Sequence, residues 1–84
     1  MRTFEKWDEL TNKSCKVVIN HVLFDEQQYE CDALRVINDE HKIGVIIKGR
    51  EIFVYKQDVS SFLVYENVYA VEDKMTTITI VNKM

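Results

Sequence analysis

The spacing of apolar residues changes near residue 15 of this chain. Before that point Phe4, Trp7 and Leu10 recur every three residues and form one apolar stripe. This stripe predicts a short helix over residues 3–12. Thr3 suits its start, because a threonine side chain accepts a hydrogen bond from a free backbone N–H group. We expect Trp7 to anchor the helix over a sheet, since large aromatic side chains are mostly buried.

From residue 15 onward the apolar period is two, which predicts β-strands joined by short polar turns. About seven strands are expected, over residues 16–24, 28–37, 43–48, 52–56, 60–65, 68–71 and 75–81. All connections have the length of a hairpin turn, so we expect antiparallel pairing. Two of the expected turns carry acidic pairs, Asp25 with Glu26 and Asp39 with Glu40.

Two of these strands contain a signal for a bend. In residues 28–37 the small and apolar residues move from odd to even positions near Ala33 and Leu34, which predicts a bulge or a sharp bend. Gly44 interrupts the next strand and indicates a bend or the close approach of another backbone. Gly49 suits a hairpin turn that needs positive φ. Two bends in adjacent strands favour an all-β fold, a small and strongly bent antiparallel barrel.

The length of 84 residues predicts one domain over 1–84. Within it we expect the helix over 3–12, a five-stranded barrel over 15–65 and an additional C-terminal hairpin over 67–82. A chain this short buries only about 60–65% of its unfolded surface, so oligomerisation is one way to gain stability. The net charge of −3 and the lack of any strongly basic region weigh against tight non-specific binding of nucleic acid. They leave room for a local basic site.

No apolar run reaches the length of a signal peptide or a membrane span. The sequence therefore predicts a cytoplasmic protein without membrane association, in which Cys15 and Cys31 are free thiols. The two cysteines and two histidines lack metal-binding spacing, and a hairpin turn at 25–26 would place Cys31 opposite Asn20 and leave Cys15 outside that pair. We expect no metal and no cofactor.

Catalytic motifs have little support in the sequence. Ser60 and Ser61 have no histidine close to them in the chain, and the sequence contains no glycine-rich loop for a phosphate group. Solvated turn charges explain the acidic pairs more simply than a general acid and base. The sequence predicts a protein that is not an enzyme.

Residues 55–61, Tyr-Lys-Gln-Asp-Val-Ser-Ser, form a polar corner between two expected strands. This corner resembles the second sequence motif of Sm-like proteins of the Hfq type, Tyr-Lys-His-Ala-Ile-Ser-Thr. Residues 32–38 fall into register with a second family pattern, Gly-x-(Ile/Leu)-x-x-Phe-Asp. The resemblance covers about residues 4–64 and implies an Sm-like or otherwise SH3-like barrel. It departs from the family where Asp32 replaces a glycine, Asn38 an aspartate, and Gln57 and Asp58 a histidine and an alanine. The helix glutamine that helps Hfq-type proteins bind uridine-rich RNA has no counterpart, because Phe4 stands near its place.

The resemblance implies a non-enzymatic module that binds RNA or single-stranded nucleic acid as a homo-oligomer. Tyr55, Lys56 and Gln57 would line the site, with Lys56 on a phosphate or carbonyl and Gln57 on a base edge. A ring would multiply Lys56 into a positive pore even in an acidic subunit. The fourth and fifth strands pair across subunits in Sm rings, so the hairpin over 67–82 would either cover that edge or extend it.

The acidic turns point to an alternative class of function. Asp25, Glu26, Asp39 and Glu40 would present carboxylates to the basic surface of a partner protein. The chain would then be an acidic protein-interaction module or inhibitor without nucleic-acid binding, of the type found in phages and mobile elements. Its glycine-poor composition, rich in lysine, glutamate, asparagine and isoleucine, fits a bacterial or phage genome rich in A and T. The sequence leaves both functions open.

Overall fold

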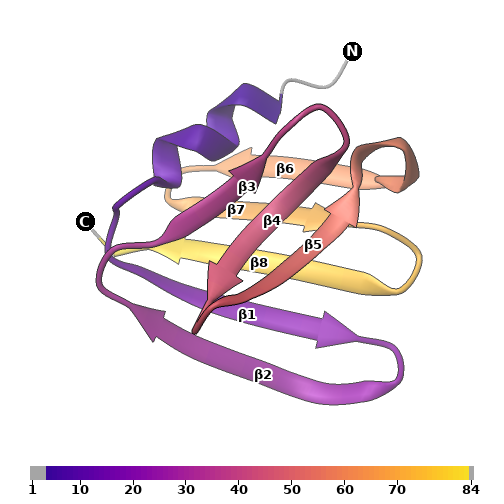
Figure 1. The fold of residues 1–84 in the computed structure, drawn as a ribbon, viewed down its shortest axis with the longest axis horizontal. Coiled ribbons are helices and arrows are strands. Elements are labelled where there is room, and N and C mark those ends of the chain that lie inside the picture. The colour runs from indigo at the N-terminus through magenta and orange to yellow at the C-terminus, as the bar shows by residue number, and fades with distance from the viewer. Residues whose placement is uncertain (1–3, 84) are drawn as a thin grey trace.

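The computed structural model describes residues 4–83, so the N-cap position expected at Thr3 lies outside the described residues. Two 3₁₀ helices and eight strands follow one another within this range (Figure 1). They are η1 (Phe4–Leu10), β1 (Cys15–His21), β2 (Phe24–Cys31), β3 (Arg35–Asn38), β4 (Lys42–Ile47), β5 (Arg50–Tyr55), η2 (Lys56–Asp58), β6 (Ser61–Tyr65), β7 (Val68–Glu72) and β8 (Thr76–Asn82).

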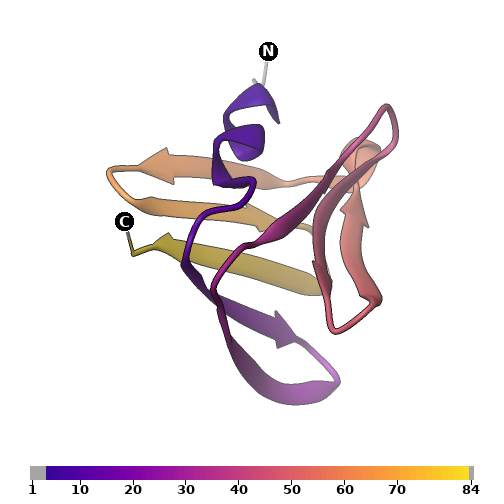
Figure 2. The ribbon, with the colours of Figure 1, turned by 60° about the vertical axis from the view of Figure 1, so that its left-hand side comes forward.

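The strands pair as two antiparallel sheets. One sheet has five strands in the order β2-β1-β8-β7-β6, and the other has three in the order β3-β4-β5. Figure 2 shows η1 near the top of both sheets. The mainly-β antiparallel fold with one short N-terminal helix is confirmed.

The expected long strand over 28–37 consists of two strands that belong to different sheets. β2 ends before Asp32 and β3 begins after Leu34, so the bend predicted near Ala33 and Leu34 is confirmed. The backbone N–H of Leu34 donates to the carbonyl of Lys13 at 3.0 Å, and its own carbonyl accepts from the N–H of Asn12 at 2.8 Å. The segment after η1 thus holds the bend in place.

The first hairpin turn lies earlier than the sequence indicated. The turn expected at 25–27 is wrong, because Val22 and Leu23 alone separate β1 from β2. The N–H of Leu23 donates to Nδ1 of His21 at 3.1 Å, and the N–H of Val22 donates to the carbonyl of Met75 at 3.0 Å. One local contact and one distant contact therefore fix this turn, which contains no glycine, proline, asparagine or aspartate that would predict it.

The C-terminal hairpin is present as β7 and β8, but its position differs from the expected one. β8 pairs with β1 as well as with β7, so the last strand is the middle strand of the larger sheet. Its Ile78 and Ile80 are fully buried. β1 and β6 both belong to residues 15–65, but they are not paired with each other, because β8 and β7 lie between them. The C-terminal hairpin therefore completes the larger sheet and is not an addition to a finished barrel.

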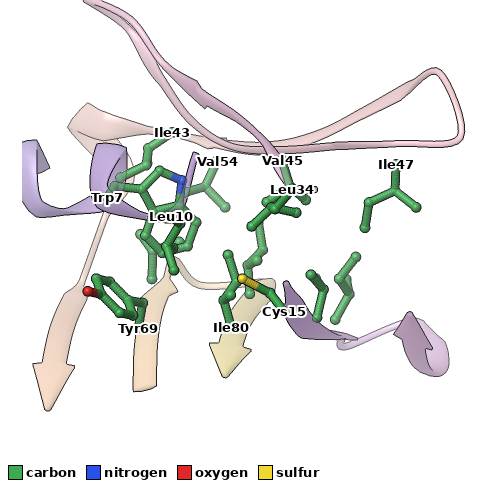
Figure 3. Packing of buried hydrophobic residues seen from close by; sticks show 14 of the residues in the cluster. Trp7, Leu10, Cys15, Leu34, Ile43, Val45, Ile47, Val54, Tyr69 and Ile80 are labelled. Atoms are coloured by element: carbon green, nitrogen blue, oxygen red, sulfur yellow. The ribbon is translucent and has the colours of Figure 1, made fainter. Parts of the chain in front are cut away.

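Trp7 lies between the two sheets and is fully buried, as its expected role as an anchor requires (Figure 3). Its Nε1 donates to the carbonyl of Gly44 in β4 at 2.8 Å. Its ring lies 6.2 Å from that of Phe62 in β6, and the ring of Phe4 lies 5.1 Å from the same side chain. η1 therefore connects the smaller sheet to the β6 side of the larger one.

Two glycines have the roles that the pattern predicted. A Cβ atom at Gly44 would lie 2.1 Å from the carbonyl oxygen of Ile52, so the backbones of β4 and β5 approach too closely for any side chain. Gly49 has φ of +79° in the turn between the same two strands. Both glycines thus shape the β4–β5 hairpin.

Candidate functional sites

The polar corner of residues 55–61 folds as the short helix η2 between β5 and β6. The N–H of Lys56 donates to the carbonyl of His41 at 2.8 Å, which places the corner beside the β3–β4 turn. A hollow of about 270 Å³ lies between them, lined by Tyr55, Lys56, Gln57, His41 and Glu40. The structure thus brings the three predicted nucleic-acid residues together, and it places one of the predicted acidic residues among them.

Lys56 is engaged in contacts within the chain. Its Nζ donates to the carbonyl of Asp39 at 2.5 Å and lies 5.2 Å from the centre of the Phe4 ring. The ammonium group therefore links the corner to the β3–β4 turn and to η1. A phosphate bound by Lys56 would have to share the ammonium group with these two partners.

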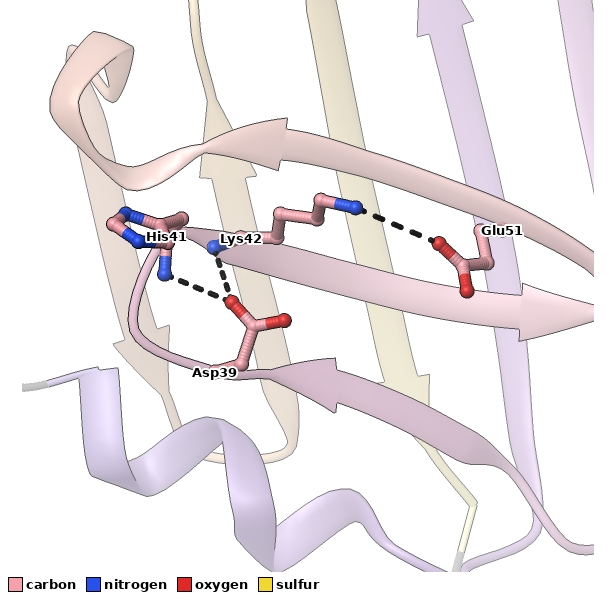
Figure 4. Close-up of polar contacts among 4 residues, drawn as sticks. All are labelled: Asp39, His41, Lys42 and Glu51. Atoms are coloured by element: carbon pink, nitrogen blue, oxygen red, sulfur yellow. Dashed lines mark hydrogen bonds and ion pairs between the residues drawn. The ribbon is translucent and has the colours of Figure 1, made fainter.

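Asp39 and Glu40 lie in the β3–β4 turn, where the sequence placed them. One carboxylate oxygen of Asp39 accepts from the backbone N–H groups of His41 and Lys42, both at 2.8 Å (Figure 4). These donors, that of His41 first, hold the pKa of Asp39 below its ordinary value. Asp39 thus shapes the turn. Glu40 is exposed, and among the described contacts its carboxylate accepts no comparable hydrogen bond.

Asp25 and Glu26 do not lie at a hairpin tip, which corrects the sequence prediction. Both belong to β2 and are exposed there. The register of β1 with β2 shifts between Ile19 and His21, so Asn20 alone faces Asp25 and Glu26 across the ladder. Two residues opposite one make a β-bulge. The prediction failed because the turn forms three residues earlier than expected.

A group of exposed apolar side chains at the β1–β2 turn was missed by sequence reasoning. Val22, Leu23 and Phe24 are 67%, 71% and 68% exposed, and Met75 in the adjoining β7–β8 turn is 45% exposed. We call these four residues the apolar tip. The one signal in the sequence was an apolar run at both odd and even positions before an acidic pair, since one face of a strand cannot bury such a run.

A hollow of about 340 Å³ adjoins the apolar tip. It lies between β2 and β5, and its walls include Phe24, Asp25, Tyr29, Arg50 and Phe53. Aromatic side chains and charged side chains of both signs therefore border one depression next to the tip.

Cys15 and Cys31 are directly opposite each other in β1 and β2, and both are free thiols. The expectation that Cys31 would face Asn20 is wrong, because it depended on the misplaced turn. Burial raises the pKa of both thiols, and the neighbouring Cys31 raises that of Cys15 further. Among residues 4–83, no group of three or more histidine, cysteine, aspartate or glutamate side chains could hold a metal ion. No helix in the same range is long and apolar enough to cross a membrane.

No protein-family model, characterised protein or solved structure matches this chain. The resemblance to Sm-like proteins therefore depends on the quoted residues alone and stays a prediction. One departure from the family has a structural reason here. Nδ2 of Asn38 donates to the carbonyl of Phe4 at 3.0 Å, a contact that the family's aspartate could not make when ionised.

Proposed function

We propose that this protein is a non-enzymatic protein-interaction module that binds a partner protein through the apolar tip. One observation carries the proposal. Val22, Leu23 and Phe24 each expose about two thirds of their surface on a turn that hydrogen bonds hold in a fixed shape. Apolar side chains gathered on a surface mark interaction sites, because water is displaced from them on binding.

The surroundings of the tip fit an interface with an apolar centre and a polar margin. Asp25 and Glu26 follow the tip directly and are exposed. Their carboxylates would steer a partner with basic residues around an apolar pocket. The sequence suggested an acidic protein-interaction module with its carboxylates at two hairpin turns. The proposal keeps this class of function, but it places the binding surface on the apolar tip and on the adjoining part of β2.

Binding of RNA or single-stranded nucleic acid is the second candidate. It is favoured by the hollow at the corner, where Tyr55 is 47% exposed and Gln57 is also exposed. A base could stack on Tyr55 while Gln57 hydrogen-bonds its edge. The contacts of Lys56 with Asp39 and Phe4, and the nearby carboxylate of Glu40, make this surface the weaker of the two.

The proposal is tested by comparing the immobilised protein with its Leu23→Asp variant in an extract of its own cells. We expect the wild-type protein to retain a protein partner that survives nuclease treatment and that the variant loses. The matched control is Ala33→Asp, which also replaces an exposed apolar residue by aspartate, in the bend that follows β2 at its end away from the tip. Equal retention by the wild-type protein and Leu23→Asp would refute the role of the tip.

The second candidate has a separate test in the same material. If the corner binds nucleic acid, a uridine-rich or adenine-rich RNA gains fluorescence anisotropy with the wild-type protein at low salt. The Lys56→Ala variant should then lose this signal and keep the fold. RNA binding that depends on Lys56 and is untouched by Leu23→Asp would favour the second candidate over the first.

A further inference from the structure

β6 forms an edge of the larger sheet although its sequence, Ser-Phe-Leu-Val-Tyr, is typical of an interior strand. Phe62 and Val64 pack against the core from one face. On the other face Leu63 and Tyr65 are 54% and 66% exposed. A strand that is apolar on both faces is normally covered on both faces.

The exposed side chains of β6 continue into an apolar area on its neighbours. Leu63 is paired with Ala70 and Tyr65 with Val68, and Val68 is paired in turn with Val81 of β8. Directly paired residues lie on the same face of a sheet. The outer face therefore carries a contiguous apolar corner at the β6 edge, which we call the outer apolar corner.

β6 also lacks the features that normally protect an edge strand. It contains no charged residue and no proline, and it pairs with β7 without a shift in register. Within residues 4–83, β7 is its one paired strand. An edge that is regular, uncharged and apolar is a template for pairing with another strand.

The backbone groups available for such pairing follow from the hairpin geometry. Tyr65 and Val68 flank a two-residue turn, so they form a hydrogen-bonded pair, and the bonding residues of an antiparallel strand alternate. Ser61 and Leu63 therefore point their N–H and C=O groups toward β7. Those of Phe62 and Val64 point away from the sheet.

We propose that β6 pairs antiparallel with β6 of a second copy of this chain about a two-fold axis at Leu63. Phe62 of each copy then exchanges hydrogen bonds with Val64 of the other. Leu63 faces its own counterpart, and Ser61 faces Tyr65. The two five-stranded sheets become one continuous sheet, and the outer apolar corners of the two copies meet beside the axis.

Charge selects β6 over the other edge of the same sheet. A two-fold pairing of β2 about Gln28 would set Glu26 opposite Glu30 twice. Like charges directly opposite each other destabilise a strand pair. The β6 register sets no charge opposite another, and its two-fold symmetry closes the assembly at a dimer. This goes beyond the proposed function and does not depend on it, because the apolar tip contains no residue of β6 and its Val22, Leu23 and Phe24 lie at the opposite edge of the sheet.

Light scattering over about 1 µM to about 1 mM protein tests the proposal with Leu63→Lys, Leu23→Lys and the wild-type chain. We expect twice the chain mass of 10.0 kDa for the wild-type protein and for Leu23→Lys. Leu63→Lys should weaken association by about a hundredfold or more, because two lysines then face each other in place of two leucines. A wild-type monomer at all concentrations, a closed assembly larger than a dimer, or a Leu63→Lys dimer would overturn the proposal.

Amide hydrogen exchange of the wild-type protein gives an answer that needs no variant. The amides of Phe62 and Val64 should exchange about tenfold more slowly or better at high protein concentration than at low concentration. Concentration-dependent protection of Gln28 and Glu30 in their place would identify β2 as the contact and overturn the proposal.

Discussion

β2 and β6 are the two edge strands of the larger sheet, and they differ in charge and in the regularity of their pairing. β2 carries Asp25, Glu26 and Glu30, and a bulge breaks its register with β1. β6 has no charge and a regular register, and its outward side chains are Leu63 and Tyr65. An edge that must remain unpaired is protected by charges and bulges. β2 is therefore protected against further pairing, whereas β6 lacks this protection, as our proposal of a β6–β6 contact requires.

The two edges also separate two kinds of contact. The apolar tip stands where β2 begins, directly before the acidic residues. Its side chains can enter a pocket of a partner, while the carboxylates of β2 oppose the addition of a second acidic strand. β6 offers backbone groups and a self-complementary apolar strip instead. Self-association at β6 and partner binding at the tip can therefore occur together.

The largest effect on this comparison is expected from Trp7→Ala. Trp7 supports β6 from inside through Phe62 and links it to β4 through the hydrogen bond to Gly44. Removing a fully buried tryptophan should lower the free energy of unfolding by about 3–5 kcal/mol, as measured by urea denaturation. The dimer should weaken as well, because Phe62 loses its support. A loss below about 1 kcal/mol would show that η1 does not hold the β6 side.

The next largest effect is expected when β2 loses its carboxylates and β6 gains a charge. The triple variant Glu26→Thr, Glu30→Thr and Leu63→Lys removes the opposed carboxylates of β2 and blocks β6. We expect association about tenfold stronger than for Leu63→Lys alone, now through β2, as measured by sedimentation. If the triple variant stays as monomeric as Leu63→Lys, the bulge and not the charge protects β2.

The sequence predicted well those features that depend on neighbours in the chain. The bend at Ala33 and Leu34, the close approach at Gly44 and the turn at Gly49 are confirmed, because each has a local signal in spacing or in residue type. Burial of Trp7 is confirmed for a similar reason, since few positions outside a core accept an indole ring.

Features set by distant partners could not be predicted in this way. The turn at Val22 is held by Met75, and the central place of β8 depends on its pairing with β1. Neither contact can be predicted from the spacing or the type of the neighbouring residues in the sequence. Of the candidate site residues, Tyr55, Lys56 and Gln57 do share one hollow. The contact of Lys56 with Asp39 became visible only in three dimensions.

A smaller effect is expected from Asp39→Ala, which acts on the approach to β6. Asp39 shapes the turn whose carbonyl accepts from Lys56, and Lys56 begins the short helix that leads into β6. The pKa of Asp39 is lowered in the folded state, so its stabilisation is present above the unfolded-state pKa and is lost as pH falls through the folded-state pKa. The melting temperature of Asp39→Ala should therefore lie below that of the wild-type protein near about pH 7, and the gap should narrow toward about pH 2.

Asp39→Asn serves as the control for this effect, because its amide oxygen can still accept the two backbone hydrogen bonds without carrying a charge. It should lie between the wild-type protein and Asp39→Ala in melting temperature. A constant gap between the wild-type protein and Asp39→Ala across the pH range would mean that the charge of Asp39 does not stabilise the turn.

The smallest effect is expected in the reactivity of Cys15 and Cys31, which are paired with each other between β1 and β2. Cys31 is half-buried on β2, whereas Cys15 is fully buried on β1. Alkylation followed by mass spectrometry, with Cys15→Ser and Cys31→Ser to assign the signals, should modify Cys31 first. Both rates should still rise as pH passes about 9, because the thiolate reacts and burial raises both pKa values. Since Cys15 becomes accessible when β2 separates from β1, its rate measures how often this edge opens. Equal rates for the two thiols would mean that β2 is frayed in solution, and its charges would then protect an edge that is seldom formed.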